Sequence, residues 1–226
     1  MSCIENDKVL RSIGAVAPEW MRLYAVTDRS WLGGRTLAEQ VKECLEGGVT
    51  FLQLREKKLD EEAFYQEALE IQKLCRDYHV PFIINDNVDV ALRCNADGVH
   101  VGQSDMEAQD VRAKLGPDKI IGVSARTVEQ AVRAEKMGAD YLGVGAVFST
   151  STKLDAREVS WETLKEICET VSIPVVAIGG ISEENLMQLS GTGVDGVAVV
   201  SAIFAQADVE AASRRLRELA EKMVRG

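Results

Sequence analysis

The chain has 226 residues, of which 46% are hydrophobic and 27% charged, and its formal net charge at pH 7 is −10. This composition is that of a globular protein with one large core, and the length fits a single α/β barrel. The negative charge argues against nucleic acid as a partner, because the mean field repels a polyanion, whereas a small phosphorylated substrate stays compatible, since a few lysines or a metal ion reverse the field locally.

The first twenty residues and the cysteines show no pattern typical of an exported protein. The five cysteines are odd in number and scattered, with no pair at the spacing of a metal site or redox motif (Cys3, Cys44, Cys75, Cys94 and Cys168). Residues 1–20 carry charges before any apolar run, so no secretory signal is predicted, and no stretch approaches the length of a membrane span. We therefore expect reduced cysteines, a cytoplasmic location and no membrane partner.

Short β-branched runs alternate with longer amphipathic runs from residue 23 onward. We expect eight strands, at 23–27, 51–55, 81–85, 98–102, 119–124, 141–148, 174–179 and 196–201. Between them lie segments with apolar residues at three- and four-residue spacing, typical of helices that cover a sheet, such as 37–45, 61–78, 128–137, 161–171 and 209–224. Regular alternation of strands and helices predicts a parallel sheet.

Similar four-residue segments precede every second predicted strand, at 48–51, 95–98, 138–141 and 193–196. A double strand–helix unit repeated four times predicts a (βα)8 TIM barrel, with residues 1–20 as a short N-terminal extension and 21–226 as a single catalytic domain. An open doubly wound sheet is the alternative, but residues 27–30 lack the glycine-rich turn it requires. Asp97, Asp140 and Asp195 precede strands, and we assign them to loop and cap structure.

The chemistry of such barrels lies at the carboxyl ends of the strands. Nearly every predicted strand end in this chain is polar or glycine. In chain order these residues are Thr27, Asp28 and Arg29; Gln53, Arg55, Glu56 and Lys57; Asn85, Asp86 and Asn87; His100, Gln103, Ser104 and Asp105; Ser124 and Arg126; Thr150 to Lys153; Gly179 and Gly180; and Val200 and Ser201.

Two carboxylates, Asp86 and Asp105, follow neighbouring strands, which lie about 4.8 Å apart in a sheet. They could bind one magnesium ion, which usually takes one or two carboxylates together with water and substrate phosphate. The alternative is that each aspartate caps a helix. We favour the metal, because phosphate-type loops face the pair.

Residues 143–153 run from an apolar strand into three hydroxyl residues and Lys153, a set of donors that suits an oxyanion. The loops after the last two strands add backbone donors at a corner that often holds phosphate in this fold. For the hydroxyl-rich loop the alternative is a solvated turn. For the loops after the last two strands it is close packing of helix against strand. Arg55, Lys57 and Lys153 add enough positive charge to bind a second anion. We therefore expect two anionic substrates.

Gln53 and Arg55 alternate with leucines and should face the barrel mouth together. Glu56 could simply pair with Arg55 or a lysine. His100 stands between two valines, and a satisfied core position is the better interpretation, while His79 should be solvated. The sequence contains no Ser/His/Asp set and no Cys/His cluster.

Ordered motifs give the chain a resemblance to a known family. They are residues 53–57 (Gln-Leu-Arg-Glu-Lys), 84–86 (Ile-Asn-Asp), 99–105 (Val-His-Val-Gly-Gln-Ser-Asp), 122–124 (Gly-Val-Ser) and 148–153 (Phe-Ser-Thr-Ser-Thr-Lys). In order and spacing they resemble thiamine phosphate synthase, and residues 179–181 and 200–201 extend the match to about residues 21–222. Ala146, where the family often has proline, and Ser104, where an acidic residue is common, are departures outside the ligand positions.

The resemblance implies a transferase of thiamine biosynthesis. Such an enzyme joins 4-amino-2-methyl-5-hydroxymethylpyrimidine diphosphate to 4-methyl-5-(2-hydroxyethyl)thiazole phosphate, and releases pyrophosphate as the thiazole nitrogen attacks a pyrimidine methylene cation. The resemblance assigns the pyrimidine diphosphate to Gln53, Leu54, Arg55, Glu56, Lys57, Asn85, Ser124 and Lys153, the thiazole phosphate to Thr150, Ser151, Thr152, Gly180, Val200 and Ser201, and one Mg²⁺ per active site to Asp86 and Asp105. Lys153, Arg55 and Ser124 are the expected catalytic residues.

Two other functions stay open on this scaffold. A thiazole tautomerase would need a proton-transferring residue, for which His100 is the one strand histidine, and would not need the set Asp86, Asp105 and Lys153. A barrel that binds thiamine precursors without turnover is the second, and phosphate-binding barrels of tryptophan or pyridoxine biosynthesis are more remote. A homo-oligomer is compatible with the sequence.

Overall fold

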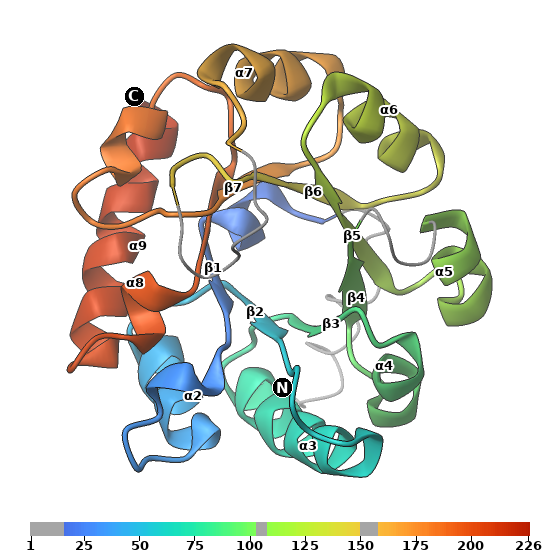
Figure 1. The fold of residues 1–226 in the computed structure, drawn as a ribbon, viewed down its shortest axis with the longest axis vertical. Coiled ribbons are helices and arrows are strands. Elements are labelled where there is room, and N and C mark those ends of the chain that lie inside the picture. Colours follow the sequence, from blue (N-terminus) through green and yellow to red (C-terminus); the bar gives the residue numbers. More distant parts are fainter. Residues whose placement is uncertain (1–15, 103–107, 150–157) are drawn as a thin grey trace, which may run out of the picture.

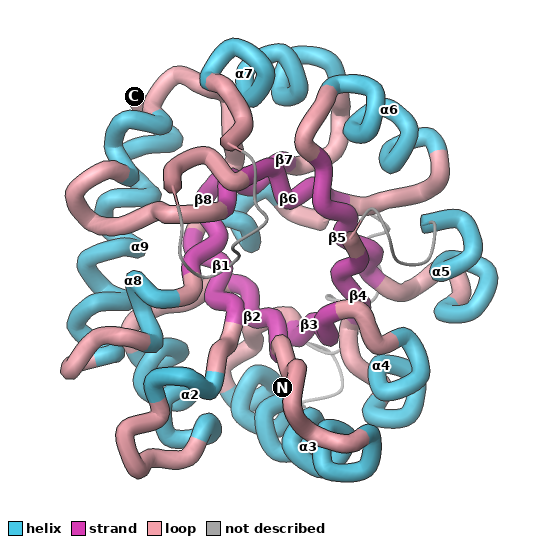
Figure 2. The backbone as a smooth tube through the Cα atoms, in the orientation of Figure 1, coloured by secondary structure: helices cyan, strands magenta, loops and turns pink. Residues whose placement is uncertain are grey.

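The computed structural model describes residues 16–102, 108–149 and 158–226. Eight parallel strands close into a barrel in sequence order, and helices surround it (Figures 1 and 2). The strands are β1 Leu23–Val26, β2 Phe51–Leu54, β3 Phe82–Asn85, β4 Gly98–Val101, β5 Ile120–Ala125, β6 Tyr141–Gly145, β7 Val175–Ile178 and β8 Gly196–Val199. The predicted (βα)8 barrel is confirmed, and the open doubly wound sheet is wrong.

The sixth predicted strand ends earlier than expected. The sequence is apolar as far as Phe148, but β6 stops at Gly145, the last residue in register with β7. Beyond it the backbone turns, and the amides of Val147 and Phe148 donate to the carbonyls of Ile178 and Gly179 at the end of β7. An apolar run therefore predicted burial correctly, since Val147 is buried, but not the end of the strand.

The helices have the bounds α2 Leu37–Glu46, α3 Glu61–Asp77, α4 Val88–Cys94, α5 Ala108–Leu115, α6 Val128–Lys136, α7 Trp161–Thr170, α8 Ser201–Phe204 and α9 Val209–Arg225. Most of them begin at a side chain that accepts a backbone N–H bond, as Thr36 does for α2 and Asp208 for α9. The link between β7 and β8 has only the 3-10 turn Leu186–Leu189 among its described residues, and the short α8 precedes α9. Within the described part of the chain, no helix is long and apolar enough to cross a membrane.

A single hydrogen-bonding device explains the fourfold sequence repeat. The third residue of each repeated segment uses its side chain to accept the backbone N–H at the start of the preceding strand. Asp97 accepts from Phe82 at 2.8 Å, Asp140 from Ile121 at 2.7 Å and Asp195 from Val175 at 2.8 Å. Thr50 does the same for Leu23 at 2.9 Å. The assignment of these aspartates to structure at the amino end of the barrel is confirmed, and each of them ties an odd strand to the next even one.

Two cores hold the molecule together. The larger one fills the space between the barrel and its helices. The smaller one lies inside the barrel and contains Tyr24, Phe51 and Tyr141 together with Val16 and Met21. Val16 and the 3-10 turn Pro18–Met21 therefore close the amino end of the barrel, so the last residues of the expected N-terminal extension belong to the barrel core.

Candidate functional site

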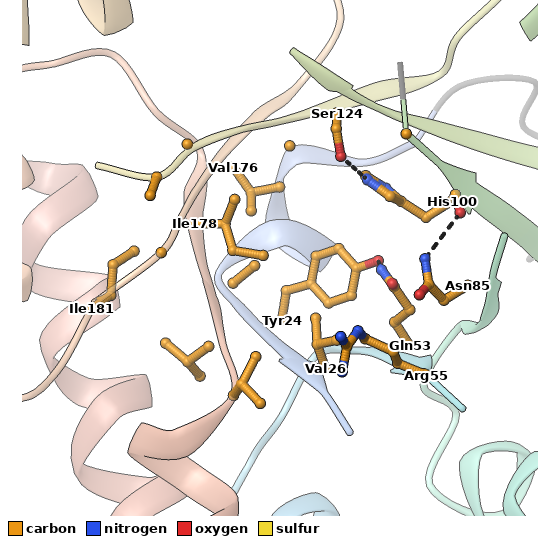
Figure 3. Close-up of a pocket in the computed structure, with 18 of the residues that line it drawn as sticks. Tyr24, Val26, Gln53, Arg55, Asn85, His100, Ser124, Val176, Ile178 and Ile181 are labelled. Atoms are coloured by element: carbon orange, nitrogen blue, oxygen red, sulfur yellow. Dashed lines mark hydrogen bonds between the residues drawn. The ribbon is translucent and has the colours of Figure 1, made fainter. Parts of the chain in front are cut away.

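A cavity of about 250 Å³ opens at the carboxyl ends of the strands. Figure 3 shows side chains from several strands that converge on it. The predicted site residues that line it are Gln53, Arg55, Lys57, Asn85, Asp86, Ser124, Gly180, Val200 and Ser201. The structure thus brings residues from the ends of β2, β3, β5, β7 and β8, widely separated in the sequence, to one site.

The end of β2 supplies the cationic side of the cavity. Gln53 and Arg55 both line it, as their alternation with leucines predicted. The Arg55 guanidinium is held by Asp28, with 3.0 Å between Nη1 and Oδ2, and its backbone N–H donates to the Thr27 hydroxyl at 2.9 Å. These contacts fix the direction of the guanidinium while a quarter of the side chain stays exposed to the cavity.

Two predicted ligands of the same segment point elsewhere. Leu54 is fully buried in the core between the barrel and its helices, so its side chain does not line the cavity. The Glu56 carboxylate is also buried and pairs at 2.9 Å with Arg29, which corrects the expected pairing with Arg55 or a lysine. The strand alternates its faces, and this places residues 54 and 56 on the side away from the cavity.

Arg29 also binds Glu67 of α3, so that one guanidinium serves two carboxyl groups. The buried Oε2 atoms of Glu56 and Glu67 have no hydrogen-bond partner among the described residues. Burial, with the nearby Glu56 charge, raises the pKa of Glu67 to about 7. This cluster fixes the loop that follows β2 from behind the cavity.

Asp86 lies at the cavity edge beside Lys57, with 2.9 Å between Oδ2 and Nζ. The cap of α4 is Asn87, whose side chain accepts the Val90 N–H, so Asp86 does not have the capping role that was its alternative. Asp86 also adopts a left-handed φ of 60°, which is uncommon outside glycine. Its predicted partner Asp105 lies outside the described residues, and the described part of the chain contains no cluster of three or more potential metal ligands.

His100 lies between two partners rather than in a purely apolar environment. Its Nδ1 is 2.9 Å from the Tyr141 hydroxyl, and its Nε2 is 3.0 Å from the Ser124 hydroxyl. The ring lines the cavity, as do Ser124 and Asn85 (Figure 3). The expectation of a satisfied histidine is confirmed, but the position is a cavity wall; His79 is exposed, as expected.

Sequence reasoning missed Tyr24, which lines the cavity, and Tyr141, which bonds to a lining residue. Both rings are buried inside strands, so their sequence context is that of ordinary core aromatics. The arrangement of the hydroxyl groups depends on neighbours from other strands, and no local motif signals it.

The opposite side of the cavity is formed by the ends of β6, β7 and β8. Gly180 has a φ of 66°, and a Cβ there would lie 2.3 Å from the Ser149 carbonyl oxygen. The loop after β7 therefore packs directly on the loop after β6, which favours glycine at this position. Val200 and Ser201 complete this corner, whereas Thr150, Ser151, Thr152 and Lys153 lie outside the described residues. The Gly145–Ala146 peptide bond is cis.

The comparison with family models gives a match over residues 23–203 to the model described as thiamine monophosphate synthase. The chain belongs to the thiamine monophosphate synthase family. The matched range includes every strand of the barrel and the described residues of both sides of the cavity. As a member of this family the protein is an enzyme, a transferase.

Relatives of this thiamine monophosphate synthase family member are similar over nearly their whole length. The thiamine-phosphate synthase of Ruminiclostridium cellulolyticum is 54% identical over 197 residues, which are 87% of this chain and 94% of the relative. That of Clostridium novyi is 50% identical over 88% of this chain and 98% of the relative. The solved structure of thiamine phosphate pyrophosphorylase from Pyrococcus furiosus is 42% identical, covers 92% of this chain and 98% of its own, and superposes with a TM-score of 0.85.

Proposed function

We propose that this chain is a thiamine-phosphate synthase that condenses 4-amino-2-methyl-5-hydroxymethylpyrimidine diphosphate with 4-methyl-5-(2-hydroxyethyl)thiazole phosphate and releases pyrophosphate. The observation that carries the proposal is the composition of one cavity. Arg55, Lys57, Asn85 and Ser124 line one part of it, and Gly180, Val200 and Ser201 line another. Two anionic substrates that must react with each other need two such regions in one site.

The pyrimidine diphosphate is assigned to the β2–β5 side. Gln53, Asn85 and Ser124 offer amide and hydroxyl groups that hydrogen-bond a polar aromatic ring. Arg55 and Lys57 bring positive charge to the mouth of the cavity, where a diphosphate attached to that ring would extend. The thiazole phosphate is assigned to the corner of Gly180, Val200 and Ser201, with residues 150–152 as further predicted contacts.

Magnesium is proposed as the cofactor, and Asp86 supports it. Its carboxylate is a hard oxygen donor at the cavity edge. Asn87, not Asp86, caps α4, and the Asp86 carboxylate lies beside Lys57, a proposed ligand of the diphosphate. Asp105 is the second proposed ligand. A magnesium ion held by these carboxylates would supply positive charge that favours departure of the pyrophosphate.

The chain's own residues would promote the reaction by position and charge. Arg55, oriented by Asp28, would stabilise negative charge that builds on the leaving diphosphate, and Lys153 is the predicted second cation. Ser124 and Gln53 would hold the aminopyrimidine while its methylene carbon becomes cationic and the thiazole nitrogen attacks. The step needs no general base at carbon, so the described lining agrees with a mechanism of orientation and charge stabilisation.

Incubation of the protein with both precursors, with and without Mg²⁺, tests this function. We expect thiamine phosphate and pyrophosphate in equal amounts, and only with the metal. Pyrimidine or thiazole binding without product would instead identify a non-catalytic binder.

Conversion of the thiazole phosphate alone to a tautomer would identify the tautomerase. One observation favours that second candidate, namely the position of His100 in the cavity wall. A cytoplasmic location and a homo-oligomeric state stay predictions.

A further inference from the structure

A chain of hydrogen-bonded side chains crosses the interior of the barrel beneath the cavity. The Gln53 amide nitrogen donates to the Tyr24 hydroxyl. The Tyr24 and Tyr141 hydroxyls are 2.8 Å apart, Tyr141 is 2.9 Å from His100 Nδ1, and His100 Nε2 is 3.0 Å from Ser124 Oγ. The function proposed above uses the two ends of this chain, Gln53 and Ser124, and assigns nothing to the three residues between them.

The donor at one end fixes the direction of every proton along the chain. The amide nitrogen of Gln53 donates to the Tyr24 oxygen. The side chain of Tyr24 is buried and has only Gln53 and Tyr141 as hydrogen-bond partners among the described residues, so its single proton finds an acceptor only if it goes to the Tyr141 oxygen. Tyr141 in turn gives its proton to His100 Nδ1. An imidazole that accepts at Nδ1 and is neutral carries its proton on Nε2, where it donates to Ser124.

Both tyrosine hydroxyl groups stay protonated near neutral pH. Burial raises the pKa of each phenol well above its usual value, so neither ionises near neutral pH. Space for the contact of Tyr141 with His100 depends on Gly122, where a Cβ would lie 2.3 Å from the Tyr141 hydroxyl and 2.5 Å from His100 Nδ1. Five strands, β1, β2, β4, β5 and β6, thus contribute to an arrangement with one consistent proton order.

We propose that Tyr24 and Tyr141 are positioning residues that hold His100 as its neutral Nε2–H tautomer and so orient Ser124 as a hydrogen-bond donor toward the cavity. Ser124 receives the imidazole proton on one side and directs its own proton away from His100. The cavity then offers a donor to a hydrogen-bond acceptor on an aromatic ring, such as a ring nitrogen. The identity of that ring rests on the proposed function, whereas the tautomer does not.

The chain contains only two histidines, so nitrogen NMR resolves the tautomer directly. Long-range proton–nitrogen correlation spectra of ¹⁵N-labelled protein without ligand, at pH 7.5, should show His100 with a protonated Nε2 and an unprotonated Nδ1. The exposed His79 supplies the reference for an imidazole that exchanges with water. A protonated Nδ1 on His100, in either the other neutral tautomer or the doubly protonated cation, would overturn the proposal.

Variants test the cause of the tautomer. Gln53→Glu replaces the amide donor by a carboxylate that accepts from Tyr24, which reverses the chain and should protonate Nδ1. Tyr141→Phe removes the link and should give a mixture of tautomers. Ser213→Ala, which loses a comparable buried hydroxyl bond to the Val209 carbonyl in α9, should leave the His100 spectrum unchanged. An unchanged spectrum in both Gln53→Glu and Tyr141→Phe would contradict the positioning role.

Kinetics connect the tautomer to the substrate. In Tyr141→Phe we expect the KM for the pyrimidine diphosphate to rise about tenfold, the equivalent of one weakened hydrogen bond, while kcat changes less. If the enzyme uses a substrate other than the pyrimidine diphosphate, this change in KM will not be observed, but the tautomer measured by NMR will be the same. Failure of the proposed function and failure of this inference are therefore distinguishable.

Discussion

Gly122→Ala is the substitution that best tests the packing beneath the cavity. A Cβ on Gly122 would lie 2.1 Å from Tyr141 Cζ and 2.5 Å from His100 Nδ1, far below the 3.4 Å at which ordinary contacts begin. One of the two rings must therefore move by roughly 1 Å, which breaks the 2.9 Å bond between them. Overpacking costs about 1–3 kcal/mol, and buried polar groups left without a partner add about 1–3 kcal/mol. The gain from a stiffer unfolded chain, about 0.4–1 kcal/mol, offsets part of this loss.

Gly143→Ala on the adjacent strand is the matched control. Its Cβ would lie 3.1 Å from His100 Cε1, so the ring needs to give by only a few tenths of an ångström. We expect a net loss of about 3 kcal/mol for Gly122→Ala, or a fall in Tm of roughly 10 °C, and less than about 1 kcal/mol for Gly143→Ala. Urea and thermal unfolding followed by circular dichroism measure both. Equal stability of the two variants would refute the view that Gly122 is kept small by the Tyr141–His100 contact.

Three further predictions concern other parts of the molecule. Because burial raises the pKa of Glu67 from 4.5 to about 7, the folded state binds more protons than the unfolded state between those values, so stability should fall as the pH rises through that window. Glu67→Gln should flatten this slope in urea unfolding at pH 5 and 8, and the same slope in variant and wild type would count against it. Asp140→Ala leaves the Ile121 N–H without its acceptor and should lower the free energy of unfolding by about 2 kcal/mol, whereas Asp140→Asn keeps an acceptor and should lose less; equal losses in chemical denaturation would contradict the strand-tying role. Asp86→Ala and Lys153→Ala should each reduce kcat about 100-fold in a pyrophosphate-release assay while changing Tm by less than a few degrees, and near-normal turnover with magnesium would refute the role given to either residue.

The barrel could be predicted because its determinants are local and repeated. Apolar runs of strand length, amphipathic segments between them and the recurrent Thr50, Asp97 and Asp140 positions all specify the same unit. The end of β6 could not be predicted, because the residues after Gly145 stay buried although they leave the strand. The apolar composition of a segment indicates that it is buried. The residue at which the backbone leaves the strand depends instead on contacts with the adjacent strand.

The candidate site was predictable where a polar side chain ends an apolar strand. Gln53, Asn85 and Asp86 stand out in this way, and all three line the cavity. The partner of Glu56 was not predictable, because Arg29 comes from another strand end and competes with nearer cations. Tyr141 was not predictable either, since a buried hydroxyl has no sequence signature until the strands that surround it are assembled.

A crystal structure with thiamine phosphate, pyrophosphate and Mg²⁺ bound tests the central claim most directly. The account predicts that the pyrimidine ring contacts Gln53 and Ser124, that pyrophosphate lies against Arg55 and Lys57, and that Asp86 binds the metal. A pyrimidine ring seated away from Ser124, or an Asp86 carboxylate without contact to the metal, would contradict it.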